Sequence, residues 1–226
     1  MFRILCTAAA TATLLFAGIA GAQQGVGSAV LAQAAAATRV AKAEYAFDLE
    51  INSAKLNWRA RFDPAQTPGL RLVQPRREDL ANDERRAFDR IAAEFEGVSW
   101  CASEQMARVA DVRLLREDAA SAVYTFQPTP ESIRGEQARR FASRLRGEAT
   151  IDKAAGDITR VRLFTPEAFS PFPLVRVDSA DIAISCATAP NGRRYAAETV
   201  TVLRGSAFGS AFNERSVQRA RNLSAI

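Results

Sequence analysis

Apolar and polar residues alternate with a period of two in many short segments of this chain. Side chains two residues apart in a β-strand lie on the same face of the sheet, so such segments predict strands with one buried face. Residues 45–62 are the clearest case, because two alternating runs flank Asn52-Ser53, which is typical turn sequence. They predict a two-stranded hairpin whose apolar face carries Tyr45, Phe47, Leu49, Ile51, Leu56, Trp58, Ala60 and Phe62.

Strand-like segments recur as far as the C-terminus. We expect roughly nine or ten short strands, spaced by about 8 to 15 residues and separated by Gly-, Pro- and Asn-containing turns. Beyond the hairpin, the segments that suggest them are 70–74, 112–116, 120–127, 148–152, 158–164, 174–177, 180–186, 197–204 and 215–223.

Two segments show helical periodicity instead. Residues 78–95 place Leu80, Phe88 and Ile91 on one apolar stripe. A second helix is predicted between Thr129, a suitable N-cap, and Gly147, a suitable C-terminal residue, with Pro130 at its first position. An Ala-rich stretch over 26–41 is also compatible with a helix.

This pattern predicts an α+β fold. Many antiparallel strands and few helices favour a large curled sheet, an incomplete barrel, whose concave face is covered by the amphipathic helices. The expected organisation is a single half-barrel domain over 23–226, preceded by a cleaved signal peptide over 1–22.

The signal peptide prediction rests on three features of the N-terminus. Arg3 supplies the positive charge, residues 4–17 are apolar or small, and Ala20-Gly21-Ala22 fits a cleavage site. A membrane anchor is the alternative, but the stretch is short, and no later segment approaches the ~20 apolar residues of a membrane span. We therefore expect a periplasmic protein with no transmembrane span.

The chain contains no histidine, which excludes more chemistry than any other feature. Histidine-based triads, His-ligated zinc and haem, and His proton shuttles are all ruled out. Carboxylates such as Asp48, Glu50, Asp178 and Asp181 show no spacing that singles out an acid and a base. We predict a non-enzymatic protein with no catalytic residue, no metal and no cofactor.

Cys101 and Cys186 are the two cysteines of the expected mature chain. Export to an oxidising compartment favours a disulfide between them, which would close a loop of 85 residues. A catalytic thiol is the alternative, but it would lack a histidine base and a flanking cation.

Aromatic residues on the predicted strand faces are the candidate ligand-binding residues. Two amphipathic helices are too few to fill a wide curled sheet tightly, so these side chains could line a cavity between sheet and helices. A filled core is the alternative, since periodicity does not separate the two. The candidates are Tyr45, Phe47, Trp58, Phe62, Tyr124 and Phe126.

The chain is basic, with 30 Lys and Arg against 25 Asp and Glu. Arginines concentrate in the predicted helix over 131–146, which could contact an anionic envelope surface or an acidic partner; a solvated outer face is the alternative. Nucleic-acid binding is not expected, because basic and acidic residues are intermixed.

A four-residue repeat, Gly-Ser-Ala-Phe, occupies 205–212. We interpret it as a glycine-containing turn or bulge that carries Phe208 and Phe212 into the core, with a binding loop as the alternative.

The C-terminal third resembles a known superfamily. Gly147-Glu148-Ala149-Thr150-Ile151-Asp152-Lys153 with Gly156, the turn at Asn191-Gly192, and Gly205-Ser206-Ala207-Phe208-Gly209 before Phe212-Asn213-Glu214 resemble the periplasmic half-barrels of lipoprotein carriers and receptors (LolA/LolB-like), a group with a stress-sensing regulator branch. The carriers hold their covering helices closed with a strand arginine. Arg59 or Arg61 is nearest in position, but neither lies in a matching motif.

Two functions follow as expectations. The resemblance implies a half-barrel that binds a lipid, an acyl chain or a lipidated or hydrophobic partner in its concavity. The alternative is an envelope regulatory or interaction protein with a packed core, which docks other proteins through a sheet edge or the basic helix.

Overall fold

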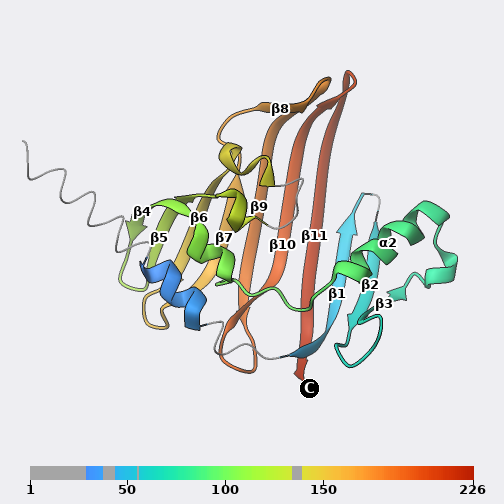
Figure 1. Cartoon of the computed structure of the whole chain (residues 1–226), viewed down its shortest axis with the longest axis horizontal. Coiled ribbons are helices and arrows are strands. Elements are labelled where there is room, and N and C mark those ends of the chain that lie inside the picture. Colours follow the sequence, from blue (N-terminus) through green and yellow to red (C-terminus); the bar gives the residue numbers. More distant parts are fainter. Residues whose placement is uncertain (1–28, 38–43, 55, 134–138) are drawn as a thin grey trace, which may run out of the picture.

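One antiparallel sheet of 11 strands dominates the computed structural model, which describes residues 29–37, 44–54, 56–133 and 139–226 (Figure 1). The strand order is β3-β2-β1-β11-β10-β9-β7-β6-β5-β4, and β8 pairs with β9. The sheet does not close into a barrel, since β3 and β4 end the order. This confirms the predicted α+β fold with a curled antiparallel sheet. The predicted signal peptide, 1–22, lies outside the described residues.

The N-terminal part of the sheet is a meander. It contains β1 (Tyr45–Ser53), β2 (Asn57–Phe62) and β3 (Leu70–Gln74), so the predicted hairpin and third strand are confirmed. Within the turn between β1 and β2, the Leu56 amide donates to the Ser53 hydroxyl at 3.0 Å.

The chain then crosses the sheet through helical segments. These are the 3₁₀ turn η1 (Arg77–Asp79), helix α2 (Asn82–Glu94), which confirms the predicted amphipathic helix, and the 3₁₀ segment η2 (Glu104–Arg108). At the start of α2, the Glu84 carboxylate accepts the Ala81 amide at 3.2 Å. Residues 29–37 are also helical, within the predicted 26–41.

The remaining strands form consecutive hairpins. They are β4 (Ala110–Glu117), β5 (Ser121–Gln127), β6 (Arg146–Asp152), β7 (Asp157–Phe164), β8 (Phe169–Phe172), β9 (Val175–Thr188), β10 (Arg194–Ala207) and β11 (Ser210–Ala225). The predicted strands 174–177 and 180–186 are one strand, β9. A bulge opposite Arg204 and Gly205 shifts its register, which interrupts the sequence alternation.

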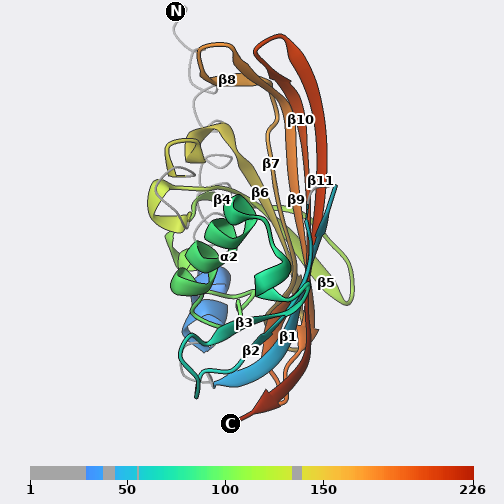
Figure 2. The same ribbon diagram turned by 90° about the vertical axis from the view of Figure 1, so that its right-hand side faces the viewer.

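The two faces of the sheet differ. Helix 29–37, α2 and the 3₁₀ segments all lie on the concave side (Figure 2). Charged residues alternate with the concave-facing ones and pair across the convex face, as Arg61 does with Asp48 at 3.0 Å and Arg219 with Glu198 at 2.7 Å. Arg162 and Asp181 form a third such pair.

The buried residues form two clusters beneath the concave side. The first lies under helix 29–37 and η2 and includes Leu31, Met106, Val112, Ala149, Ile151 and Ile158. The second lies under α2 and includes Phe47, Leu49, Trp58, Phe62, Leu70 and Phe88. Each cluster is therefore covered by its own helical segment.

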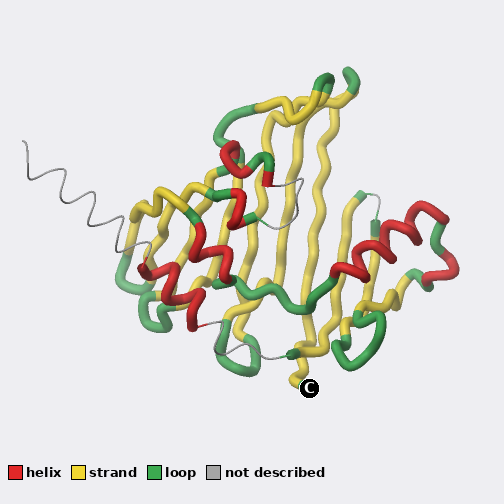
Figure 3. The backbone as a smooth tube through the Cα atoms, viewed as in Figure 1, coloured by secondary structure: helices red, strands yellow, loops and turns green. Residues whose placement is uncertain are grey.

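The predicted second helix does not extend over the whole of 129–147, because among the described residues Arg139 is helical but both ends of the range are not. Thr129 and Ser132 do cap each other, with Thr129 N donating to Ser132 Oγ at 2.9 Å, and the element that begins there is the 3₁₀ turn η3 (Pro130–Ser132). Ile133 and Leu145 are extended, a second turn, η4 (Ala142–Arg144), lies between them, and β6 already includes Gly147 (Figure 3). Pairing with β5 and β7 prevails over local helix signals. Residues 134–138 lie outside the described part.

The prediction that the 205–212 repeat carries both phenylalanines into the core is also wrong. The repeat forms the tip of the β10–β11 hairpin, where Ala207 pairs with Ser210. Phe208 lies in the turn and is 77% exposed, while Phe212 is half-buried. A two-residue turn leaves no room to fold a ring back onto the sheet.

Candidate functional site

An apolar pocket of about 360 Å³ lies over the first cluster. Its floor is the concave face of β5, β7, β9 and β10, which contributes Phe126, Val161, Leu163, Ile182, Ile184 and Ala196. The opposite wall comes from the segments on either side of β4 and β5, with Trp100, Met106, Val109, Ile133 and Leu145. Among the described residues, no charged side chain lines it.

The floor depends on a close approach at Gly147. A Cβ atom there would lie 2.1 Å from Cζ of Phe126, so only glycine leaves room for this ring. Gly147 pairs with Phe126 on one side and Leu163 on the other, and both of these line the pocket. Gly147 thus makes room for the Phe126 ring, which is part of the pocket floor.

The Trp100 wall is attached to the sheet in two ways. Cys101 and Cys186 form a disulfide, as predicted, with an S–S distance of 2.04 Å. The backbone adds two hydrogen bonds, which form the β-bridge between Trp100 and Tyr195: Cys101 N donates to Arg194 O at 3.1 Å, and Ala196 N donates to Ser99 O at 2.8 Å. Cys101 therefore serves as a structural anchor beside the pocket.

The part of the wall that contains Leu145 contacts a side chain at the end of β5. The Gln127 amide nitrogen lies within hydrogen-bonding distance of three carbonyl oxygens, those of Pro128 at 3.1 Å, Ala142 at 2.9 Å and Leu145 at 2.9 Å. These contacts tie the end of β5 to the segment around η4.

The six predicted cavity residues are divided between the clusters. Only Phe126 lines the pocket, and Tyr124 packs against the first cluster beside it. Phe47, Trp58 and Phe62 belong to the second cluster under α2. Whether any of these residues contacts a ligand stays a prediction.

Tyr45 lies between the two clusters. Its ring meets Trp100 edge-on with centroids 6.1 Å apart, and its hydroxyl accepts the Asn191 amide at 3.2 Å. The side chain thus joins β1 to the turn between β9 and β10.

Sequence reasoning missed most of the pocket. Ile182 and Ile184 belong to a predicted strand, so their shared face was visible in the alternation of 180–186. Met106 and Val109 come from a segment without a clear period, and no sequence signal places them opposite β9.

A second depression, of about 760 Å³, lies between α2 and the part of the β10–β11 hairpin that contains Thr201, Leu203 and Phe212. It is more polar, with Asp83 and Glu84 from α2 facing Thr201, Leu203 and Phe212 from the sheet. This mixture distinguishes it from the apolar pocket, whose described lining residues carry no charge.

The carboxylates with lowered pKa values lie away from the apolar pocket. On the convex face, a hydrogen bond from Asn222, followed by the Arg61 interaction, lowers the pKa of Asp48. At the β4–β5 turn, the backbone amides of Ser121 and Ala120 lower the pKa of Asp118. These groups stabilise turns and strand pairs, and none of them lines the pocket.

The fold and pocket together define a class, an open antiparallel half-barrel with an apolar pocket on its concave side. No family model matches the chain, and no curated protein matches it. A solved structure of MucB in complex with MucA(peri) aligns over 86% of this chain and 94% of that one, with 13% identity and a TM-score of 0.26. A TM-score this low supports no assignment of family or function.

A helix that crosses a bilayer must be both long and apolar, and this applies to each helix in the described part of the chain. None of them meets both requirements.

Proposed function

We propose that this protein is a non-enzymatic, periplasmic binding protein that holds an acyl chain or a similar apolar ligand in the pocket over β5, β7, β9 and β10. The observation that carries the proposal is this pocket of about 360 Å³, whose lining is apolar and, among the described residues, uncharged. Ligand sites of this kind commonly measure about 300–1,000 Å³ and are lined mainly by apolar side chains.

The few polar groups at the pocket fit an apolar chain with a polar head. Ser99, Ser103, Gln105 and Ser132 contribute uncharged hydrogen-bonding groups on the wall side. An apolar chain would then contact the apolar side chains of the sheet floor, and its polar head group would form hydrogen bonds with these wall residues. A charged group buried on the sheet floor would find no counter-ion among the described residues, so we place the carboxylate of a fatty acid on the wall side and its chain on the floor.

An interaction protein that docks a partner strand is the second candidate. The edge strand β4 offers backbone groups, and Leu115 on it is half exposed. However, β4 contains two register shifts against β5 and a positive φ at Asp111. Irregularities of this kind hinder the pairing of an edge strand with a strand from another chain. The pocket therefore supports the first candidate better.

The two tryptophans of the chain provide the test. Trp100 lines the pocket, while Trp58 is buried in the other cluster beneath α2. In Trp58→Phe, only Trp100 fluoresces, and dibromostearic acid should quench it as the bromine atoms approach. In Trp100→Phe, the remaining Trp58 is the matched control and should keep its intensity. Equal quenching in both variants, or none in either, would count against the pocket.

A pocket-filling variant gives an independent test. Ala196→Phe places a ring in the pocket, whereas Ala183→Phe places the same ring on the opposite face of the sheet, since Ala183 alternates with Ile182 and Ile184. We expect about a tenfold or greater loss of fatty-acid affinity in the first variant only. Native mass spectrometry of protein purified from its own periplasm should then show a bound lipid for Ala183→Phe and none for Ala196→Phe.

A further inference from the structure

Strands β8 to β11 extend beyond the rest of the sheet and end in two adjacent turns (Figures 1 and 2). One turn is Pro173-Leu174, between β8 and β9, and the other is Phe208-Gly209, between β10 and β11. The Phe208 amide donates to the Leu174 carbonyl at 2.8 Å, so the two turns form one unit. We call this unit the apolar tip and define it as Phe172, Leu174 and Phe208.

The apolar tip exposes large side chains to an unusual degree. Leu174 is 73% exposed, Phe208 77% and Phe172 50%. Three of the seven large apolar side chains exposed in the described residues thus lie at this one end. Such a concentration marks a contact site more often than isolated exposed residues do.

The backbone of the tip argues against a role in folding. Leu174 has φ of 64° and Phe208 of 51°, both in the left-handed region. Turns with positive φ at these positions favour Gly or Asn, and bulky side chains are unfavourable there. Both turns therefore carry an apolar side chain where local structure prefers a small or polar residue, which points to a use outside the fold.

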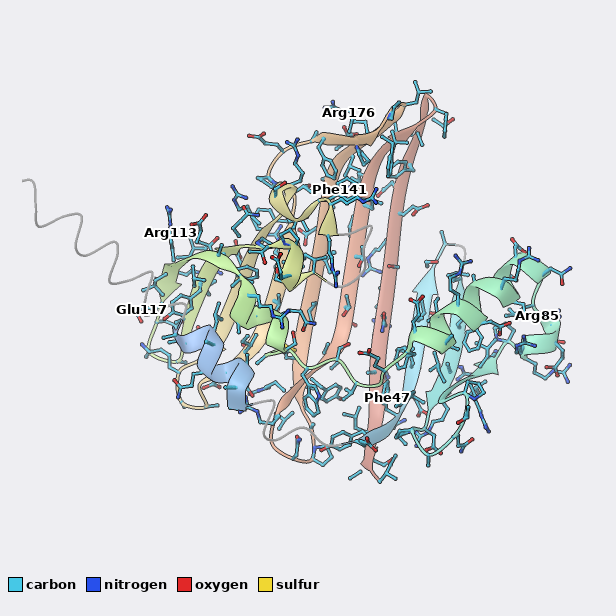
Figure 4. The ribbon with its side chains drawn as sticks, in the orientation of Figure 1. Phe47, Arg85, Arg113, Glu117, Phe141 and Arg176 are labelled. Carbon is cyan, nitrogen blue, oxygen red and sulfur yellow. A yellow bond between two sulfur atoms is a disulfide. The ribbon has the colours of Figure 1, made fainter. Side chains whose placement is uncertain are left out.

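Positive charge lies just below the tip. Arg176 is two residues from Leu174, or about 7 Å along β9, and the exposed Arg204 is four residues from Phe208, or about 13 Å along β10. Asp178, which pairs with Arg176 at 2.8 Å, is the single acidic residue among the described residues 169–178 and 204–213. Figure 4 shows Arg176 at this end of the sheet.

We propose that the apolar tip inserts into the surface of a phospholipid bilayer, with Arg176 and Arg204 on anionic head groups. Side chains on protruding turns suit a medium that deforms around them, whereas a protein partner would need a matching cavity for each. The turn backbone limits insertion to the interfacial region, where peptide groups stay hydrated. Guanidinium groups at that depth bind phosphates, so the two arginines complement anionic lipid.

The inference goes beyond the proposed ligand pocket, since no tip residue lines it. The two are connected through Phe141, whose ring lies 5.5 Å from Phe169 and 6.2 Å from Phe172 in centroid distance. Phe141 precedes η4, and Leu145 at the end of that turn lines the pocket. The tip would therefore hold the pocket close to a membrane.

Co-sedimentation with sucrose-loaded vesicles tests the proposal. The disulfide-bonded protein is mixed with vesicles of phosphatidylcholine and phosphatidylglycerol in equal parts, or of phosphatidylcholine alone. We expect binding to the mixed vesicles that weakens with salt. Leu174→Asn with Phe208→Asn should reduce the partition coefficient about tenfold or more, and asparagine suits the positive φ of both positions.

The matched control is Val73→Thr with Leu115→Thr, which removes two similarly exposed apolar side chains from the edge strands β3 and β4. It should bind like the wild type. No vesicle binding by the wild type, or equal binding by the tip variant, would overturn the proposal. Equal binding to both vesicle types would overturn the role of the arginines.

Sedimentation velocity separates membrane contact from self-association. A wild-type dimer that becomes a monomer in the tip variant would assign the tip to a second copy of the chain and overturn the proposal. Quenching of Trp100 by the fatty acid is measured without vesicles, so failure of the pocket and failure of the tip are distinguishable.

Discussion

The two halves of the concave side are built on the same alternating strands, yet their cores differ. The core beneath α2 is packed with aromatic rings (the filled half), and the depression of about 760 Å³ lies beside it, toward β10 and β11. An apolar pocket lies over the core beneath helix 29–37 and η2 (the hollow half). Under α2, aromatic rings pack on each other, with Phe47 and Phe95 each 5.3 Å from Phe62 and Trp58 5.6 Å from Phe88 in centroid distance. Under helix 29–37 and η2, the buried side chains are mostly Ala, Val, Ile, Leu, Cys and Met. Large aromatic rings close the space under α2, whereas smaller aliphatic side chains leave a pocket beside the cluster under helix 29–37 and η2.

The filled half should respond most strongly to truncation. Phe47 is 1% exposed and contacts two other rings, so Phe47→Ala leaves a cavity that the neighbours cannot close. We expect a loss of about 4 kcal/mol in the free energy of unfolding, measured by urea denaturation. A loss below about 1 kcal/mol would show that this half is also loosely packed.

The hollow half should depend on its covalent link instead. Cys101→Ala with Cys186→Ala frees a loop of 85 residues, and we expect a loss of about 3 kcal/mol. In the Trp58→Phe background, Trp100 emission should shift to longer wavelength as its wall separates from β10. Unchanged Trp100 emission would mean that the backbone bonds at Ser99 and Cys101 hold the wall on their own.

A smaller effect is expected at the pocket floor. Leu163→Ala removes a half-buried side chain that already borders open space, so the loss of unfolding free energy should be only about 1 kcal/mol. Fatty-acid affinity should nevertheless fall several-fold, as read from Trp100 quenching. A loss as large as that of Phe47→Ala would contradict the contrast between the two halves.

The smallest effect should come from the convex face. Asp48 has a lowered pKa and is partly exposed, so its interactions with Asn222 and Arg61 contribute less than about 1 kcal/mol. A lowered folded-state pKa gives stability that is present above the unfolded value of 3.8 and is lost as pH falls below it. Urea midpoints of wild type and Asp48→Asn, measured from pH 6 to pH 3, should therefore converge below about pH 4. A constant difference would exclude this linkage.

Pairing within hairpins followed well from local patterns. The alternation in 45–62 involves neighbours in sequence, and the β1–β2 hairpin forms as predicted. The segments 148–152 and 158–164 were also predicted as strands, and they pair with each other as β6 and β7. The disulfide followed from cysteine count and expected compartment. Such features depend on few residues, so a single sequence specifies them.

The errors occur where distant contacts prevail over local preference. Cap, proline and glycine signals over 129–147 agree with a helix, but Gly147 is required in β6, where Phe126 occupies the space of a side chain. The candidate cavity residues were chosen for aromatic size, although aromatic size is what fills the α2 half. Which space remains open depends on the covering segments, and their placement is not encoded in the strand alternation.

Pairing between β1 and β11 has a kinetic consequence. Tyr45 lies opposite Ala225, so the strand that joins the α2 half to the rest of the sheet is the last one in the chain. Sheets that depend on contacts between distant residues fold slowly, on the millisecond-to-second scale for small domains, because the ends must meet before the contact stabilises them. We therefore expect the β1–β3 meander to remain an unattached unit until residues 210–225 are available, and the final closure of the sheet to limit the folding rate.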